Sequence, residues 1–296
     1  MTPHRPAPTS EAEYREYPAI NFSSLAAYNI SPDHALMKVD HKAYFEYGRQ
    51  FETMLQDTVK GTDEFKKRFF KSTVSGKMPD ELIQWIDKNE DLESKYNLNK
   101  DGSRSKTSAT RHAFLDEAQA NPGKIPVSIQ DWDMLNRHTE NMLKMQYLDA
   151  NVEDILAAGE WQVPILWEEN GHKKKALIDV LVDLGGEYLP IDIKTTAGFR
   201  KFSYDLRDRY FLQAIHYCQG VTMNNGVAME MPFFVASKEA PYLCQPWTVD
   251  FGGVDFKTAA IVEYHQLCDD YQAWRDAGKP PKGWLPLGVV KRFPKI

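Results

Sequence analysis

Residues 174–196 read KKALIDVLVDLGGEYLPIDIKTT and contain two strand-like runs, 174–183 and 187–195. The Gly185-Gly186 pair between them predicts a tight turn, because glycine adopts the positive φ angles that such turns need. Since a tight two-residue turn joins antiparallel neighbours, this segment predicts a β-hairpin.

The residues on both sides extend this hairpin into a larger sheet. Residues 160–168 are extended and aromatic-rich, and Asn170-Gly171 is a strong hairpin signal, so we expect an antiparallel three-strand meander. Downstream, the pattern predicts a helix over 204–218, strands over 231–236 and 242–249, and a closing helix over 254–275. This order predicts an α/β or α+β fold in which helices flank a mixed central sheet.

The chain before residue 159 has a different pattern. Four prolines lie within the first eighteen residues, and we expect residues 1–20 to form a flexible arm. Apolar spacings of three and four predict a helical lobe over 21–158, in which Ser128 begins a long helix that continues to Ile155. A polar stretch over 94–107 predicts an exposed loop.

Composition and charge limit the class of protein. The chain has 296 residues, of which 42% are hydrophobic, enough for one large domain or two small ones. Its net charge of −6 weakly disfavours non-specific nucleic-acid binding, but a local basic groove remains compatible with it. Three cysteines exclude a disulfide framework and a four-thiolate iron–sulfur or zinc site, and suit a reducing cytoplasm. No run approaches eighteen apolar residues, so we expect no membrane span.

Two neighbouring strands carry acidic residues that point to a metal site. Asp192 and Lys194 share one face of the third predicted strand, because side chains alternate along a strand. Asp179 is a carboxylate in an otherwise apolar strand one hairpin away, and a buried carboxylate usually has a partner or a metal. With the Ile193 carbonyl, the two carboxylates would offer hard oxygen ligands to magnesium or manganese. The alternative is a hairpin-edge salt bridge with Lys194; Asp183 is a rival ligand that we expect to be solvated.

A row of hydrogen-bonding side chains follows on the predicted helix 204–218. Arg209, Gln213 and Tyr217 are spaced by four residues and therefore share one helical face. Beside a metal site such a row suits a phosphate backbone. Taken alone, it more often marks a solvated helix edge.

The ordered combination of these residues resembles the PD-(D/E)xK nuclease superfamily, in its RecB-like branch. Asp179 is followed by Asp192-Ile193-Lys194 on the next strand and by Gln213-x-x-x-Tyr217 on the next helix. The Asp-x-Lys triplet alone is weak, and the combination with the meander is what makes the resemblance specific.

The likeness extends over most of the chain. Residues 191–220 closely resemble the nuclease domain of the exonuclease VIII (RecE) type and its phage relatives, and residues 17–36 resemble it as well. This implies a restriction-endonuclease-like core over 159–296, with the helical lobe over 21–158 contributing to the active-site cleft.

The resemblance also implies roles for single residues. Asp179, Asp192 and the Ile193 carbonyl would hold magnesium or manganese, and Lys194 would orient or deprotonate a water or stabilise charge on the phosphate. Glu160 matches an acidic residue that related exonucleases place upstream of the aspartate; an ordinary strand-end charge is the alternative. Glu52 stands where the family commonly has histidine, and it is either an acidic site residue or a plain surface glutamate.

DNA contacts are implied next to this centre. Gln213 and Tyr217 would contact a phosphate or a base. Basic residues flank the site in sequence and are further candidates, although each cluster also fits a solvated face: Lys173, Lys174, Lys175, Arg200, Lys201, Arg207, Arg209, Lys291, Arg292 and Lys295.

The activity implied by the resemblance is that of a processive 5′→3′ exonuclease on double-stranded DNA ends. It would leave 3′ single strands for an annealing protein that acts in recombination, and would form a trimeric or tetrameric ring in the cytoplasm. An endonuclease, or an exonuclease of other polarity, is the nearest alternative. A catalytically inactive module that binds DNA ends or a partner is the alternative from another class.

Overall fold

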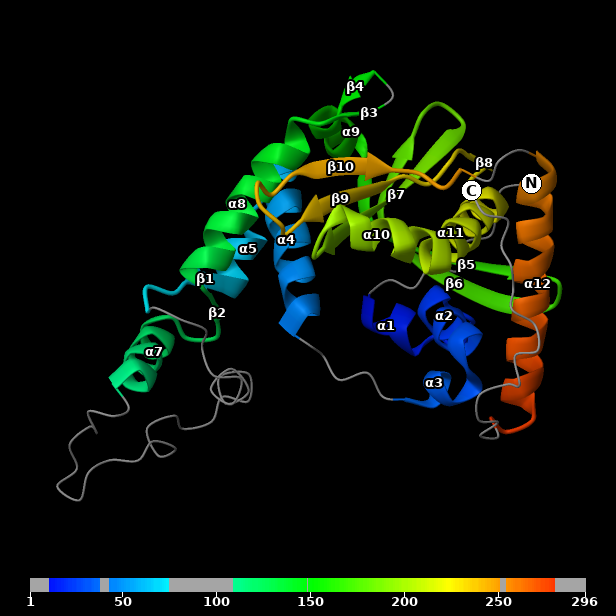
Figure 1. Ribbon diagram of the computed structural model, residues 1–296, viewed down its shortest axis with the longest axis horizontal. Coiled ribbons are helices and arrows are strands. Elements are labelled where there is room, and N and C mark those ends of the chain that lie inside the picture. The colour runs from blue at the N-terminus through cyan, green and yellow to red at the C-terminus, as the bar shows by residue number, and fades with distance from the viewer. Residues whose placement is uncertain (1–10, 38–42, 75–108, 148, 251–253, 280–296) are drawn as a thin grey trace. The chain divides into compact units, whose positions relative to one another are not determined.

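The computed structural model describes residues 11–37, 43–74, 109–147, 149–250 and 254–279, and it divides the chain into two compact units (Figure 1). The first unit takes its described residues from 1–41, 145–240 and 244–296, and the second from 42–144 and 241–243. The sequence division at residue 158 therefore differs from the compact units, because the described residues of 21–37 and 145–158 belong to the same unit as the sheet. No helix in the described ranges has the length and apolar character needed to cross a membrane.

A mixed sheet forms the centre of the first unit. Its strands follow the order β10-β9-β7-β6-β5, and the short β8 also pairs with the beginning of β7. The strand bounds are β5 (Glu160–Glu169), β6 (His172–Asp183), β7 (Glu187–Thr196), β8 (Val227–Ala228), β9 (Phe233–Ser237) and β10 (Cys244–Trp247). Strands β5, β6 and β7 are antiparallel, whereas β7 and β9 are parallel. The predicted meander and mixed sheet are confirmed.

The turn between β5 and β6 forms where the sequence predicts it. Asn170 and Gly171 have φ angles of 52° and 75°, the positive values that a tight hairpin turn requires at both central positions. Gly185 and Gly186, between β6 and β7, also have positive φ angles. Asp183 is exposed there and accepts hydrogen bonds from both of these glycine amides, at 2.9 and 3.2 Å. It therefore acts as a turn residue.

The helix α11 (Phe211–Asn224) covers one face of β5 and β6. Trp167, Ile178 and Val163 are buried beneath it, and each such side chain contributes about 2 kcal/mol of hydrophobic free energy. A Cβ at Gly220 would lie 2.8 Å from the Trp167 ring, so glycine allows this close approach.

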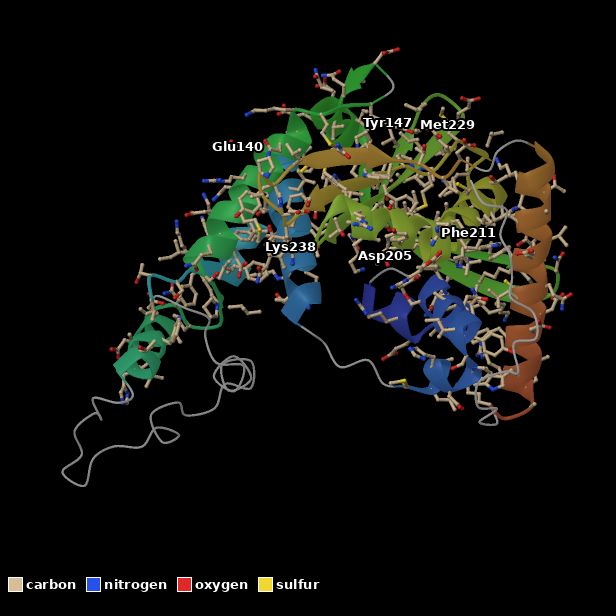
Figure 2. The ribbon with its side chains drawn as sticks, viewed as in Figure 1. Glu140, Tyr147, Asp205, Phe211, Met229 and Lys238 are labelled. Carbon is tan, nitrogen blue, oxygen red and sulfur yellow. The ribbon has the colours of Figure 1, made fainter. Side chains whose placement is uncertain are left out.

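Further helices complete the first unit. Its apolar core includes residues from α2, α11 and α12. The helix bounds are α1 (Glu11–Glu16), α2 (Phe22–Ile30), α3 (Pro32–Leu36), α9 (Val152–Ala158), α10 (Phe199–Asp205) and α12 (Val254–Asp276). A π-helical turn, Leu206–Tyr210, separates α10 from α11, so the single helix predicted over 204–218 is wrong at its beginning. Asp205 and Phe211, labelled in Figure 2, flank this turn.

The predicted N-terminal arm is also wrong over its described part. Residues 11–16 form α1, and Ile20, only 1% exposed, pairs with β6 through hydrogen bonds of 2.9 and 2.8 Å to Lys173 and Lys175. This segment is held by backbone pairing, which its proline-rich composition does not reveal.

The second unit is mainly helical. It contains α4 (Ala43–Lys60), α5 (Glu64–Arg68), α7 (Ala109–Ala120) and α8 (Ile129–Leu143), with a parallel pair formed by β1 (Phe69–Lys71) and β2 (Ile125–Val127). Ser128 caps α8 as predicted, accepting a hydrogen bond of 3.1 Å from the Asp131 amide. The polar stretch 94–107 lies outside the described residues.

The helix that begins after Ser128 ends earlier than predicted. It stops at Leu143, and the short strands β3 (Gln146–Tyr147) and β4 (Ala150–Asn151) reverse the chain before α9. Asp149, at φ 60°, adopts the left-handed conformation within this reversal. The apolar spacing continues through the break because Met145, between α8 and β3, and Val152, in α9, are both buried.

Candidate active site

A fork between β6 and β7 brings the two predicted carboxylates together. The two strands pair from Asp183 and Tyr188 to Val180 and Ile191, and the ladder stops there. The next pair in register would be Asp179 and Asp192. Beyond this point β7 continues beside β9, while β6 pairs with Ile20 instead. The two aspartates therefore face one another where the strands separate.

Side chains replace the missing ladder bonds at the fork. One carboxylate oxygen of Asp179, Oδ2, accepts a hydrogen bond of 2.8 Å from the Ile193 amide. Asp192 is only 2% exposed; its Oδ1 accepts a hydrogen bond from Gln213, and its Oδ2 forms an ion pair with Lys194. The predicted salt bridge with Lys194 is thus present, and it forms part of the site.

Burial and mutual repulsion shape the electrostatics of this cluster. Burial raises the pKa of Asp179 to about 7, and the neighbouring charge of Asp192 acts in the same direction. Burial alone would lower the pKa of Lys194, but the charges of Asp192 and Asp179 outweigh it, so the pKa of Lys194 lies above its usual range. Two carboxylates share one ammonium, which leaves an excess of negative charge when both are ionised.

The helical segments add donors and aromatic rings to the site. Gln213 is buried and donates to Asp192, and it also hydrogen-bonds with Tyr217. Burial, followed by the charges of the two aspartates, raises the pKa of Tyr217 well above its usual range. The Lys194 ammonium lies 5.5 Å from the centre of the Tyr210 ring, at the end of the π-helical turn. Such turns occur often at functional sites, and this one sets Tyr210 beside Lys194.

For two further acidic candidates, no contact within the described ranges settles a role at the fork. Glu160 is exposed at the beginning of β5, opposite Leu181. Glu52 lies on α4 in the second unit. Across the described ranges, no three histidine, cysteine, aspartate or glutamate side chains gather closely enough to hold a metal ion. Glu160 and Glu52 therefore stay predictions.

The basic candidates divide into exposed and buried groups. Arg200, Lys201, Arg207 and Arg209 are exposed. Two of these side chains have acidic neighbours: Lys201 forms an ion pair with Asp205, and Arg207 with Asp208 at 2.8 Å. Their contact with DNA stays a prediction. Lys291, Arg292 and Lys295 lie outside the described residues.

The predicted DNA contacts of Lys174 and Lys175 are wrong. Lys174 is 1% exposed and forms an ion pair with Glu169 at 2.7 Å. Lys175 is 4% exposed and donates three hydrogen bonds of 2.7–2.9 Å to the carbonyls of Tyr14, Arg15 and Tyr17. Both ammonium groups therefore bind other groups of the protein, where β6 runs beside the N-terminal segment.

Gln162 is a site residue that the sequence analysis did not identify. It lies opposite Asp179 on β5, and its side chain hydrogen-bonds with the Asp179 carboxylate. In a hairpin, residues at equal distances from the turn lie opposite one another. The Asn170-Gly171 turn therefore predicts from sequence alone that Gln162 lies opposite Asp179.

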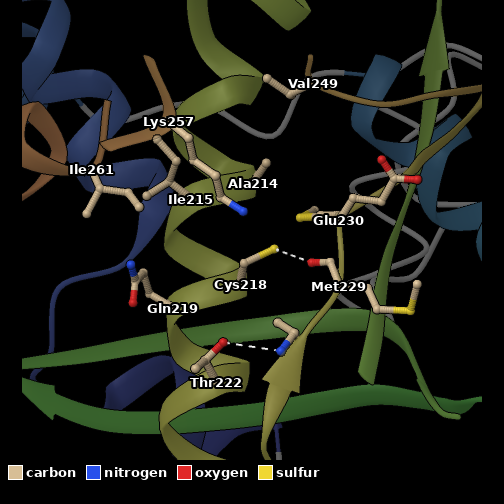
Figure 3. A pocket seen from close by; sticks show the side chains of 12 residues that line it. Ala214, Ile215, Cys218, Gln219, Thr222, Met229, Glu230, Val249, Lys257 and Ile261 are labelled. Carbon is tan, nitrogen blue, oxygen red and sulfur yellow. Dashed lines mark hydrogen bonds between the residues drawn. The ribbon is translucent and has the colours of Figure 1, made fainter. Parts of the chain in front are cut away.

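A separate cavity of about 500 Å³ lies on another face of α11 (Figure 3). Cys218 and Thr222 line it from the helix, and Glu230 and Lys257 add one charge of each sign. Burial raises the pKa of the Cys218 thiol to about 12, which makes it a poor nucleophile. None of the fork residues lines this cavity.

With this geometry in place, residues 111–283 match the family described as a PDDEXK-like domain of unknown function. The chain belongs to this family. The PDDEXK-like domain includes the fork strands and α11, so membership in the PD-(D/E)xK nuclease superfamily, predicted from Asp179, Asp192 and Lys194, is confirmed.

Comparison with solved structures gives a weaker relation. A crystal structure from Eubacterium rectale, described as a "putative exonuclease", shares 13% sequence identity with our chain. The alignment covers 88% of our chain and 94% of the Eubacterium rectale chain, with a TM-score of 0.39. No curated protein matches the chain.

Proposed function

We propose that the chain is a divalent-metal-dependent deoxyribonuclease that degrades double-stranded DNA from its ends in the 5′→3′ direction. The observation that carries the proposal is the meeting of Asp179, Asp192 and Lys194 at the fork. Membership of a PDDEXK-like family supports a nuclease, and the matched residues, 111–283, include the fork.

The fork suits a divalent cation in both ligand type and charge. Carboxylate and carbonyl oxygens are ligands that magnesium and manganese prefer, and Asp179, Asp192 and the Ile193 carbonyl supply them. Burial raises the pKa of Asp179, and the negative charge of Asp192, which the single ammonium of Lys194 does not fully offset, acts in the same direction. When bound, a divalent cation would neutralise charge on a phosphate and acidify water.

The protein side chains would then divide the remaining tasks. Lys194 is held as an ammonium by the two carboxylates, which favours charge stabilisation on the phosphate over proton abstraction. Gln213 keeps the Asp192 carboxylate in place through its donated hydrogen bond. The exposed Arg200, Arg207 and Arg209 would contact the phosphate backbone, so binding should weaken as salt rises.

The finer assignment is supported by sequence resemblance. Residues 191–220 are similar to nuclease domains of the RecE type, which supports action on duplex ends, a 3′ single-stranded product and an annealing partner in recombination. It also supports a trimeric or tetrameric ring and a cytoplasmic location. A ring lined by the basic residues would reconcile DNA handling with the net charge of −6.

The test compares linear and covalently closed circular duplex DNA of one sequence, with 5′ or 3′ end labels, in magnesium and in chelator. We expect the linear duplex to lose nucleotides from its 5′ ends, the circle to stay intact, and chelator to stop the reaction. Cleaved circles would indicate an endonuclease, and release from 3′ ends the opposite polarity. A shifted but undegraded linear duplex in magnesium would contradict catalysis and favour a DNA-end-binding module.

A further inference from the structure

Gln162 has an unusual backbone conformation for its place in the fold. Its φ angle is 53°, in the left-handed region that favours glycine. Of the five non-glycine residues with positive φ in the described ranges, it alone lies inside a strand; Asp149, Asn170, Tyr242 and Lys279 lie in turns or after a helix. Such a conformation costs about 1–3 kcal/mol and persists where the surroundings enforce it.

The flanking residues hold this conformation in place. Trp161 pairs with Val180 and Val163 pairs with Ile178, while the pair between them is missing from the ladder. Val163 is fully buried, and the Trp161 indole donates a hydrogen bond of 3.2 Å to the Leu156 carbonyl. The strand is therefore regular on both sides of Gln162, and the departure is confined to this one residue.

Asp179 lies where the ladder is interrupted on both edges of β6. On one side its regular partner would be Asp192, and on the other it would be Gln162. Its carboxylate receives hydrogen bonds from both directions, from the Ile193 amide and from the Gln162 side chain. The strained residue and the candidate metal ligand are thus direct neighbours.

We propose that Gln162 is a positioning residue of the metal centre, which holds the Asp179 carboxylate in the orientation that a divalent cation needs. The inference deepens the proposed function and rests on it. The backbone strain at Gln162 is then the cost of directing an amide at Asp179 from the adjacent strand. Gln162 also occupies the place where a third carboxylate would complete an acidic cluster around Asp179 and Asp192.

The experiment measures Mn²⁺ binding to the full-length protein by calorimetry, beside unfolding free energy in the absence of metal. In Gln162→Gly, glycine accepts the φ angle without strain, so stability should be equal or higher while the Mn²⁺ affinity falls by about tenfold. In Gln162→Glu, the added carboxylate should raise the Mn²⁺ affinity by about tenfold. Asn170→Gly is the matched control, because it changes a residue of the same φ in the same hairpin; it should leave the affinity unchanged.

The proposal is overturned if Gln162→Gly binds Mn²⁺ as the wild type does, if Asn170→Gly weakens binding equally, or if the wild type binds no Mn²⁺. Should Gln162→Gly fold poorly, Gln162→Glu decides, and an affinity at or below the wild-type value overturns the proposal. Nuclease assays with the same proteins separate the two hypotheses. Mn²⁺ binding that depends on Gln162, in a wild type without nuclease activity, would refute the proposed function alone.

Discussion

The two ends of the β5–β6 hairpin contain non-glycine residues with almost the same φ angle, Asn170 at 52° and Gln162 at 53°. At the turn end, asparagine tolerates the left-handed conformation, and the adjacent Gly171 completes a tight turn. At the fork end, glutamine has no such preference, and its neighbours in the strand are regular. Local turn chemistry explains the conformation of Asn170, whereas that of Gln162 has no such local explanation, and we attribute it to the adjacent Asp179.

The charged residues follow the same division. Near the turn, Lys174 and Lys175 are buried. Lys174 forms an ion pair with Glu169, and Lys175 donates hydrogen bonds to carbonyls at the end of α1. At the fork, Asp179 and Asp192 share a single ammonium, and the pKa of Asp179 rises. At the turn end each buried ammonium has its own partners, Glu169 for Lys174 and three carbonyls for Lys175, whereas at the fork two carboxylates meet one ammonium, an excess of negative charge that suits the proposed cation site.

The largest expected effect lies at the fork. Asp192→Asn removes a charged ligand but keeps the size of the side chain, so nuclease activity should fall by about 10³-fold, equivalent to about 4 kcal/mol. Steady-state rates on linear duplex, with circular dichroism to confirm folding, measure this. Full activity in a folded Asp192→Asn protein would refute the assignment of the site.

The turn end should respond in stability alone. Glu169→Gln leaves the buried Lys174 ammonium without its counter-charge, and we expect a loss of about 3 kcal/mol in unfolding free energy by denaturant titration. The activity of the folded fraction should not change. Glu168→Gln, at the exposed neighbouring position, is the control and should have little effect. Equal stability in the two variants would contradict the structural role of the Lys174–Glu169 pair.

Metal binding should depend on pH through Asp179. Because its pKa is raised to about 7, the carboxyl is increasingly protonated below that pH and a cation must displace the proton. The Mn²⁺ affinity should therefore fall by about tenfold from pH 8 to pH 6, with proton release measured in buffers of different ionisation enthalpy. Asp179→Asn should abolish this dependence. An unchanged pH profile in that variant would show that another group titrates.

The smallest expected effect is at the turn. Asn170→Ala places a Cβ-bearing residue without asparagine's tolerance at φ 52° and should cost about 1 kcal/mol, whereas Asn170→Gly should be nearly neutral. Thermal unfolding compares the two. If alanine is tolerated as well as glycine, the conformation at Asn170 is set by the rest of the hairpin and not by turn chemistry.

Local patterns in the sequence were sufficient for the meander, both tight turns and the superfamily motif, because alternation and turn chemistry act between near neighbours. They failed where a contact crosses long stretches of chain. Lys174 and Lys175 look like an exposed basic cluster, yet both are buried, and Lys175 donates to the carbonyls of Tyr14 and Arg15, which lie about 160 residues earlier in the chain. The helix predicted from Ser128 to Ile155 is divided into α8, which packs against α4, and α9, which packs against β6.

Which acidic and polar groups actually meet was a property of the folded chain. The order Asp179, Asp192, Lys194, Gln213 and Tyr217 could be found by inspection of the sequence, since the motif depends only on residue type and spacing. The separation of β6 from β7, the donation from Gln213 and the strained approach of Gln162 arise from strand pairing and burial, which act through space between residues far apart in the chain.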